Sequence, residues 1–267
     1  MHPIERLRYV ARSSGVDQRS LVRETAMALR GLRGDPTGLL VSCRRILERH
    51  PTSGALWALA ARTLTAADPA QELGLFARQF DDDPTPELLY DAIPQDATVC
   101  VLGWPDLVGE AILRRGDVCV LAVDMLGEGS GFVQRLRRAD VDAEVVAPAG
   151  LGAAVGAADL VLLEASAAGP GGILAVAGSR AAAAVAYCSE LPVWAVVGQG
   201  RRLPGPLWSA LLNRLEYSAD PWELDDEVVP AGTISHVVGP DGLRPGTADL
   251  DGPECPAAPE LLKLVSR

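Results

Sequence analysis

The first third of the chain has the apolar spacing of amphipathic helices. Between residues 4 and 80, apolar positions recur every three or four residues, which places them on one face of each helix. The predicted helices lie within DQRSLVRETAMALRGL (17–32), DPTGLLVSCRRILERHP (35–51), HPTSGALWALAARTLTA (50–66) and PAQELGLFARQF (69–80). Asp17 is an expected N-cap of the first helix, and Thr52 or Ser53 of the third.

The pattern changes after residues 81–86, where three aspartates and two prolines mark the expected boundary between two parts. From residue 98 on, short apolar runs alternate with helical ones. The apolar runs are TVCVLG (98–103), VCVLAVD (118–124), EVVAP (144–148), LVLLEAS (160–166) and VWAVVG (193–198). Such an alternation predicts a parallel sheet that is buried on both faces.

We therefore predict an α/β protein, in which an N-terminal helical domain (1–92) precedes a Rossmann-like parallel sheet domain (93–267) with helices on both faces. Ligands of such sheets bind at the carboxyl ends of the strands. In this chain those ends hold Gly103 and Trp104, Asp124, Glu164 to Ser166, and Gly198 and Gln199.

One of these strand ends runs into a glycine-rich segment. An apolar strand at 160–163 is followed by Gly169, Gly171 and Gly172, and then by Ser179, which opens an alanine-rich helix. The spacing fits neither of the two common nucleotide-binding fingerprints. Backbone N–H groups of the loop, together with the helix dipole, would suit an anion. A plain tight turn is the alternative, since glycine serves that equally well.

The charge of the chain is unevenly distributed. The formal net charge is −11, which argues against nucleic acid as a general partner. Residues 1–50 nevertheless hold ten arginines against five acidic residues. An acidic ligand could lie against this part, although arginines on solvated helix faces are the simpler interpretation. We find no signal peptide and no apolar run long enough to span a membrane, so we expect a cytoplasmic protein without membrane contact.

Few residues have the spacing of known catalytic groups. The five cysteines are scattered without a C-x-x-C pair, which disfavours a disulfide framework, a metal site or a cofactor that needs one. The three histidines suggest no catalytic triad. Asp124 and Glu164, both at strand ends, are the best candidates for acid–base chemistry. A helix cap or a loop hydrogen bond is the alternative for each.

The order of these segments resembles a known family. HPTSGALW, the five strands and DLVLLEASAAGPGGILAVAGSRAAAAVAYCSELPVWAVV are similar to the alpha, beta and delta subunits of eukaryotic initiation factor 2B. That superfamily also contains methylthioribose-1-phosphate and ribose-1,5-bisphosphate isomerases. The family's central pattern matches here at Asp159–Leu163, Gly171, Gly172, Gly178, Ser179, Pro192 and Val196. VLGWPDLVGEAIL and EVVPAGTISHVVGPDGLRP resemble two further family segments, so the resemblance covers nearly the whole chain.

The departures from the family bear on catalysis. Isomerases of the family have a cysteine after the first strand of the sheet, where this chain has Gly103, Trp104 and Pro105. They have an aspartate where this chain has Ser166. The family's Asn-Lys pair falls on Ala175 and Val176. Glu164 lies two residues before Ser166, on the same face of a continuing strand, and could replace the missing aspartate.

Our first hypothesis is a bacterial relative of the initiation factor 2B subunits that is noncatalytic or catalytically altered. It would form a homodimer and bind a small phosphorylated metabolite or a protein partner, without a cofactor. The alternatives are an aldose–ketose sugar-phosphate isomerase that uses Glu164 and Asp124, and a scaffold subunit. The expected ligand-binding residues are Arg12, Thr52, Ser53, Gly103, Trp104, Ser166, Gly171, Gly172, Ser179 and Gln199.

Overall fold

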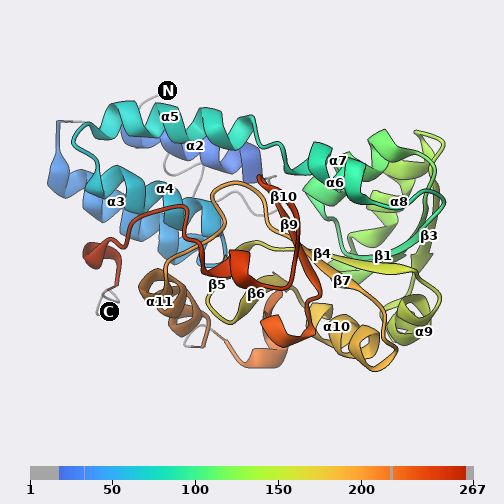
Figure 1. The fold of residues 1–267 in the computed structure, drawn as a ribbon. Coiled ribbons are helices and arrows are strands. Elements are labelled where there is room, and N and C mark those ends of the chain that lie inside the picture. The colour runs from blue at the N-terminus through green and yellow to red at the C-terminus, as the bar shows by residue number, and fades with distance from the viewer. Residues whose placement is uncertain (1–17, 33, 217–218, 263–267) are drawn as a thin grey trace.

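The fold is described by a computed structural model, which defines residues 18–32, 34–216 and 219–262. Two parts lie side by side along its long dimension (Figure 1). One part is a bundle of helices formed by the N-terminal third of the chain. The other is a sheet with helices above and below it. The predicted α/β fold class is confirmed.

The helical part begins with four helices, three of which have a side-chain cap at their N-terminus. They are α2 (Gln18–Arg30), α3 (Pro36–Arg49), α4 (Gly54–Thr65) and α5 (Pro69–Asp81). The expected cap of the first, Asp17, lies outside the described residues. Asp35 and Asp68 accept hydrogen bonds from backbone N–H groups of α3 and α5, and a proline follows each. Ser53 caps α4, which confirms one of the two expected caps. Helix α4 is apolar on nearly all sides and is buried at the centre of the bundle.

A seven-stranded sheet forms the second part, in the order β10-β9-β7-β4-β1-β2-β3. Its strands are β1 (Thr98–Leu102), β2 (Cys119–Val123), β3 (Asp142–Val146), β4 (Leu160–Glu164), β7 (Val193–Val196), β9 (His236–Gly239) and β10 (Gly242–Pro245). All neighbours are parallel except β10, which forms an antiparallel hairpin with β9. The five strands predicted from the apolar runs are confirmed.

Two apolar layers hold helices against the two faces of this sheet (Figure 1). Within β1, Val99 and Val101 face one layer, while Cys100 and Leu102 face the other. Helices α6 (Thr85–Ala92), α7 (Asp106–Arg115) and α8 (Gly129–Arg137) cover the first face, and α9 (Leu151–Gly156) and α10 (Ser179–Cys188) cover the second. The alternation explains why each central strand is apolar throughout.

A small antiparallel sheet follows β4 and was not expected from the sequence. It has the order β5-β6-β8 and consists of β5 (Ala167–Gly169), β6 (Gly172–Val176) and β8 (Asp226–Pro230). Pro170 and Gly171 form the turn between β5 and β6, and Gly171 has a φ of 92°, which favours glycine there. The predicted glycine loop is therefore a hairpin turn, and strand β6 separates it from α10.

The core of the helical part continues beyond residue 92. Helix α11 (Gly205–Glu216) and the C-terminal residues Cys255, Ala258 and Leu261 pack in the same apolar cluster as α2–α5. Conversely, Leu89 of α6 packs with the sheet. The chain thus crosses between the two parts more than once. No helix in the described residues is long and apolar enough to cross a membrane.

Candidate ligand-binding site

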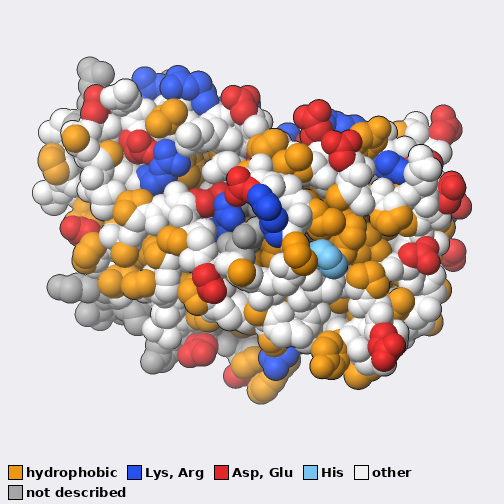
Figure 2. Space-filling model, viewed as in Figure 1, with side chains coloured by type: hydrophobic (Ala, Val, Ile, Leu, Met, Phe, Trp, Pro, Cys, Tyr) orange, Lys and Arg blue, Asp and Glu red, His pale blue; other side chains and the backbone are white. Residues whose placement is uncertain are grey.

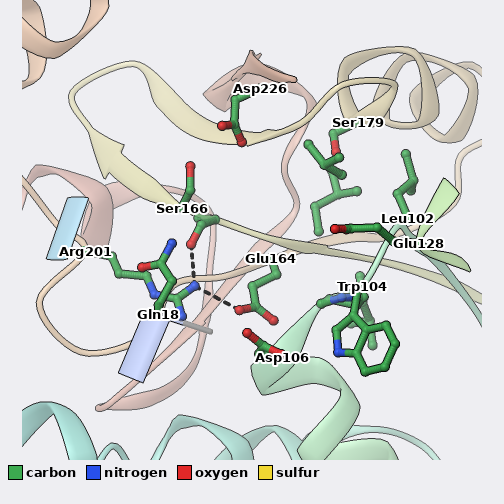
Figure 3. Close-up of a pocket in the computed structure, with 15 residues that line it drawn as sticks. Gln18, Leu102, Trp104, Asp106, Glu128, Glu164, Ser166, Ser179, Arg201 and Asp226 are labelled. Atoms are coloured by element: carbon green, nitrogen blue, oxygen red, sulfur yellow. Dashed lines mark hydrogen bonds and ion pairs between the residues drawn. The ribbon is translucent and has the colours of Figure 1, made fainter. Parts of the chain in front are cut away.

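A cavity of about 150 Å³ opens where the carboxyl ends of β1 and β4 meet the start of α2 (Figure 3). Glu164 and Ser166 enter it from the end of β4, and Trp104 and Asp106 from the turn after β1. The other polar lining residues come from the start of α2, the start of α8, the start of α10, the loop after β7 and the start of β8: Gln18, Glu128, Ser179, Arg201 and Asp226. Its position is the one expected for a parallel sheet.

Glu164 is held in place by hydrogen bonds to both carboxylate oxygens. Its Oε2 accepts from the backbone N–H groups of Leu107 (2.8 Å) and Val108 (3.2 Å) in the first turn of α7. Its Oε1 accepts from Arg201 Nη1 at 3.0 Å, and the two side chains are 11% and 4% exposed. Burial raises the pKa of the Glu164 carboxyl, and Arg201 offsets part of that rise. Glu164 therefore serves as a helix cap and ion-pair partner.

Asp226 is a carboxylate of the cavity that the sequence interpretation missed. The side chains of Thr52 and Ser166 interact with it and lower its pKa, so the helical part, the loop after β4 and the start of β8 meet at this side chain. Burial raises the pKa of Asp226 from an ordinary 3.8 to about 6, and neighbouring Asp225 adds to the rise. Thr52 and Ser166, both expected to bind ligand, instead contact a carboxylate that itself lines the cavity.

The cavity is acidic. Asp106, Glu128, Glu164 and Asp226 line it, whereas Arg201 is the one cation among its described lining residues. Burial raises the pKa of the Glu128 carboxyl, and the charges of Asp106 and Asp225 raise it further. Arg201 is already paired with Glu164.

Within the part of the chain that the structure describes, three buried polar atoms of the lining have no hydrogen-bond partner. They are Gln18 Oε1, Ser179 Oγ and Arg201 Nε. Ser179 is only 1% exposed. Buried polar atoms are nearly always hydrogen-bonded in native proteins, so three such atoms around one cavity point to a bound molecule or water.

A second cavity of about 200 Å³ adjoins the first, and Gln18, Asp106 and Arg201 line both. It contains two further arginines, Arg19 and Arg135. Arg19 forms a bidentate ion pair with Glu110, at 2.7 and 3.0 Å. The guanidinium of Arg135 lies 6.0 Å from the centre of the Trp104 ring, between the two cavities.

Three helix N-termini around the first cavity, those of α7, α8 and α10, are already occupied by side chains of the protein. Glu164 caps α7, and Asp124 Oδ1 accepts from Gly129 N at the start of α8 (2.7 Å). Glu227 Oε1 accepts from the N–H groups of Gly178 (2.6 Å) and Arg180 (2.9 Å) at the start of α10. These carboxylates neutralise the positive helix ends that would otherwise attract a phosphate.

Several predicted site residues line the cavity or reach a residue that does. Glu164, Trp104, Ser166 and Ser179 line it, and Thr52 reaches it through Asp226. The other predicted site residues that the structure describes do not line the cavity. Asp124 and Ser53 cap α8 and α4.

The remaining predicted residues are held in the backbone framework. The carbonyl of Gly171 accepts from Ala231 N, and Gly172 lies against the carbonyl of Val229. Gly103, with a φ of 64°, makes the turn after β1, and the N–H of Gln199 donates to Asp83 Oδ2 at 2.9 Å. Arg12 lies outside the described residues.

The residues that sequence reasoning missed are Gln18, Asp106, Glu128, Arg201 and Asp226. Only two of them gave any local signal. Asp106 opens a predicted helix directly after a strand, and Asp226 belongs to an acidic pair before an apolar run. Among the described residues, no group of three or more His, Cys, Asp or Glu side chains is arranged to hold a metal ion.

Comparison with known proteins gives similarity at the level of structure only. No protein-family model matches the sequence, and no curated protein does. Translation initiation factor eIF-2B of Pyrococcus horikoshii OT3 is similar with a TM-score of 0.78 and 13% identity, covering 93% of this chain and 98% of that one. The structure of eIF2B beta from Chaetomium thermophilum is similar with a TM-score of 0.69 and 15% identity, and the match covers 91% of this chain and 86% of that one. The structure of eIF2B delta from the same organism is similar with a TM-score of 0.68 and 16% identity, and the match covers 88% of this chain and 96% of that one.

These likenesses extend over nearly the whole length of each chain, and they agree with the resemblance in the sequence. At 13–16% identity they establish the fold and leave the function open. The chain has the fold of the initiation factor 2B alpha, beta and delta subunits.

Proposed function

We propose that this chain is an initiation factor 2B subunit-like protein that binds a small phosphorylated metabolite across the two adjoining cavities and does not isomerise it. The observation behind this proposal is the set of unpartnered buried atoms around the cavity at the strand ends, Gln18 Oε1, Ser179 Oγ and Arg201 Nε. A small polar molecule that fills this space would satisfy all three.

The lack of isomerase activity is proposed from the positions of the acid–base candidates. Gly103, Trp104 and Pro105 form the turn where the related isomerases have a cysteine. Glu164 has both oxygens engaged by Leu107, Val108 and Arg201, so it is not free to exchange a proton with a substrate. Proton transfer between adjacent sugar carbons needs a positioned acid and base.

The phosphate would lie in the second cavity. Arg135 lies beside Trp104 and is not paired with a carboxylate in the residues described, and Arg201, which also lines this cavity, has an unpartnered Nε donor. The first cavity is less suited to phosphate because the N-termini of α7, α8 and α10 are capped by carboxylates and its lining is acidic. The same hypothesis also allows a protein partner, in place of the metabolite, to bind at this site.

An isomerase remains a second candidate because of one observation, the carboxyl group of Asp226. It lies at the cavity with a pKa of about 6, a value suited to general acid–base catalysis near neutral pH. In that case Asp226, and not the expected pair of Glu164 and Asp124, would exchange the proton. Turnover of methylthioribose-1-phosphate or ribose-1,5-bisphosphate at about 1 s⁻¹ or faster would favour this candidate.

A thermal-shift screen of sugar phosphates and nucleotides tests the proposed function. Ligand at roughly 100 times its dissociation constant should stabilise the protein by about 2.7 kcal/mol. Arg135→Ala should weaken binding by about ten- to a hundredfold, since a charge-assisted hydrogen bond contributes about 1.5–3 kcal/mol. The matched control is Arg138→Ala at the end of the same helix, outside both cavities. Equal effects of the two substitutions, or no shift with any compound, would contradict the proposal.

A further inference from the structure

We infer that Glu254 is a positioning residue for Arg201: by holding the loop 198–203, it fixes the guanidinium of Arg201 against Glu164. Arg201 is the one cation in the described lining of the first cavity, and it lines the second cavity as well. The position of Arg201 is a property of the chain itself. Only the consequence for ligand affinity rests on the proposed function.

The loop 198–203 follows β7 and is held from several sides. It forms no helix and no strand of its own. At the junction of α5 and α6, Asp83 Oδ2 accepts from the backbone N–H of Gln199 at 2.9 Å. From the small sheet, the N–H of Ala168 donates to the carbonyl of Arg201 at 2.8 Å. Contacts of this kind therefore decide where the Arg201 backbone lies.

Glu254 contacts the loop on both sides of Arg201. Its Oε2 accepts from the backbone N–H of Arg202 at 3.1 Å, and its own N–H donates to the carbonyl of Arg202 at 3.0 Å. Its Oε1 accepts from Arg202 Nη2 at 3.2 Å and from Gln199 Nε2 at 3.3 Å. The side chains of Glu254 and Arg202 are only 9% and 13% exposed. One buried carboxylate thus binds the residues that bracket Arg201.

The contacts of Arg201 depend on the place of its backbone. Its Nη1 donates to Glu164 Oε1 at 3.0 Å and to the carbonyl of Ala165 at 2.6 Å (Figure 3). A single nitrogen that serves two fixed acceptors tolerates little displacement, because hydrogen bonds weaken steeply when their geometry is lost. Glu254 lines neither cavity, so it would act on the site through the loop.

The segment that carries Glu254 packs on both parts of the molecule. Residues 248–262 run from the sheet toward the helical part (Figure 1). Leu250 lies in the apolar layer on the second face of the sheet. Further along, the side chains in the apolar cluster of the helical part are Cys255, Ala258 and Leu261. Glu254 lies between these two anchored stretches, so the seating of the segment fixes its carboxylate.

A simpler interpretation makes Glu254 only the counter-ion of buried Arg202. Asp241 is a second carboxylate beside Arg202, with Oδ2 at 3.4 Å from Nη2, and its side chain is 64% exposed. If pairing with Arg202 were the whole role of Glu254, its removal would leave the ion pair of Arg201 and Glu164 unchanged. The two interpretations therefore differ in whether Glu254 is coupled to Glu164.

A double-mutant cycle measured by urea denaturation, without any ligand, decides between them. Glu164→Gln should lower the folding equilibrium constant, since it leaves Arg201 buried without its anion. In the background of Glu254→Gln, the same substitution should lower it by a factor at least about fivefold smaller, because Arg201 is already displaced. Direct repulsion between the two carboxylates would give coupling of the opposite sign. Additive effects, or coupling of that opposite sign, would overturn the inference.

Asp241→Asn is the matched control, and its effect should add to that of Glu164→Gln. Gln199→Ala removes one contact of Glu254 and should couple to Glu164→Gln with the same sign, which keeps the test decisive if Glu254→Gln does not fold.

Isothermal titration calorimetry with ribose 5-phosphate gives the readout at the site. Glu254→Gln should raise the Kd by about three- to tenfold, and Asp241→Asn by less than about twofold, because a displaced Arg201 loses part of a charge-assisted hydrogen bond. A coupled cycle with no binding of ribose 5-phosphate, or with an unchanged Kd in Glu254→Gln, would count against the proposed function and leave the positioning of Arg201 by Glu254 standing.

Discussion

Replacement of Asp226 by asparagine should stabilise the protein at neutral pH. In the folded chain this carboxyl is surrounded by Ser166, Thr52 and a second acidic residue, Asp225, and its charged form is poorly solvated. Asparagine has the same shape and can still accept from the two hydroxyl groups. The substitution therefore removes an unfavourable charge with little loss of packing.

The magnitude follows from the pKa. A rise from 3.8 in the unfolded chain to about 6 in the folded one corresponds to a cost of about 3 kcal/mol when the group is ionised in both states. Weaker hydrogen bonds to asparagine offset about 1 kcal/mol of this. A net gain of about 1–2 kcal/mol is expected above pH 6. Between these two pKa values the folded state binds more protons than the unfolded state, so Asp226 makes the stability of the wild type fall as pH rises. The gain from Asp226→Asn should therefore disappear below about pH 4, where the carboxyl is protonated in both states.

Urea denaturation of the wild type and Asp226→Asn at about pH 7.5 and pH 4 measures the effect. Asp225→Asn is the matched control, because that neighbour is exposed and should shift stability by less than about 0.5 kcal/mol. A loss of stability in Asp226→Asn at pH 7.5, or a gain that is the same at both pH values, would refute the reasoning.

Three further predictions concern packing, the buried ion pair and assembly. Gly54→Ala should destabilise the folded protein by about 1–3 kcal/mol, since an added Cβ would lie 2.9 Å from the carbonyl oxygen of Ser166. In the same denaturation assay, Gly152→Ala in α9 should be neutral or stabilising, because a Cβ there would meet open space. Arg201→Met should cost about 3–5 kcal/mol by leaving Glu164 buried without its cation, and adding Glu164→Gln should recover much of the loss; no recovery would contradict the role of charge. Light scattering should show a dimer, expected from the alanine- and glycine-rich segment 149–186, and a stable monomer at micromolar concentration would contradict it.

The arrangement of the strands was accessible from the sequence because both faces of the sheet are covered. Within residues 98–102 and 160–163, apolar side chains point to both faces of the strand. The result is a nearly unbroken apolar run, which is typical of a parallel strand buried on both faces. The cap of α4 was equally legible, since Ser53 stands directly before an apolar helical run. These are local signals, and the structure follows them.

The small sheet and the site were less accessible because they depend on contacts between distant segments. Strand β6 pairs with β8 some fifty residues later, and nothing near Gly172 indicates that partner. Glycines suggested a loop for a phosphate, but Gly171 serves the hairpin turn. Asp226 and Arg201 come from loops and strand ends whose sequences look unremarkable, and only the fold brings them to Glu164.

The surface agrees with the uneven charge seen in the sequence. Figure 2 shows Arg side chains gathered along the top of the helical end, and acidic side chains scattered around the sheet end. The cavity lies between these two parts, where carboxylates of the sheet side adjoin arginines of α2 and α8.

The most direct test of this account is a crystal structure of the protein with a sugar phosphate that the thermal-shift screen selects. We expect polar atoms of the ligand within about 3 Å of Gln18 Oε1 or Ser179 Oγ, the length of an ordinary hydrogen bond. We expect the phosphate beside Arg135 and Arg201 in the second cavity. A ligand bound on the outer helices, or one that places its phosphate among the carboxylates, would contradict the account.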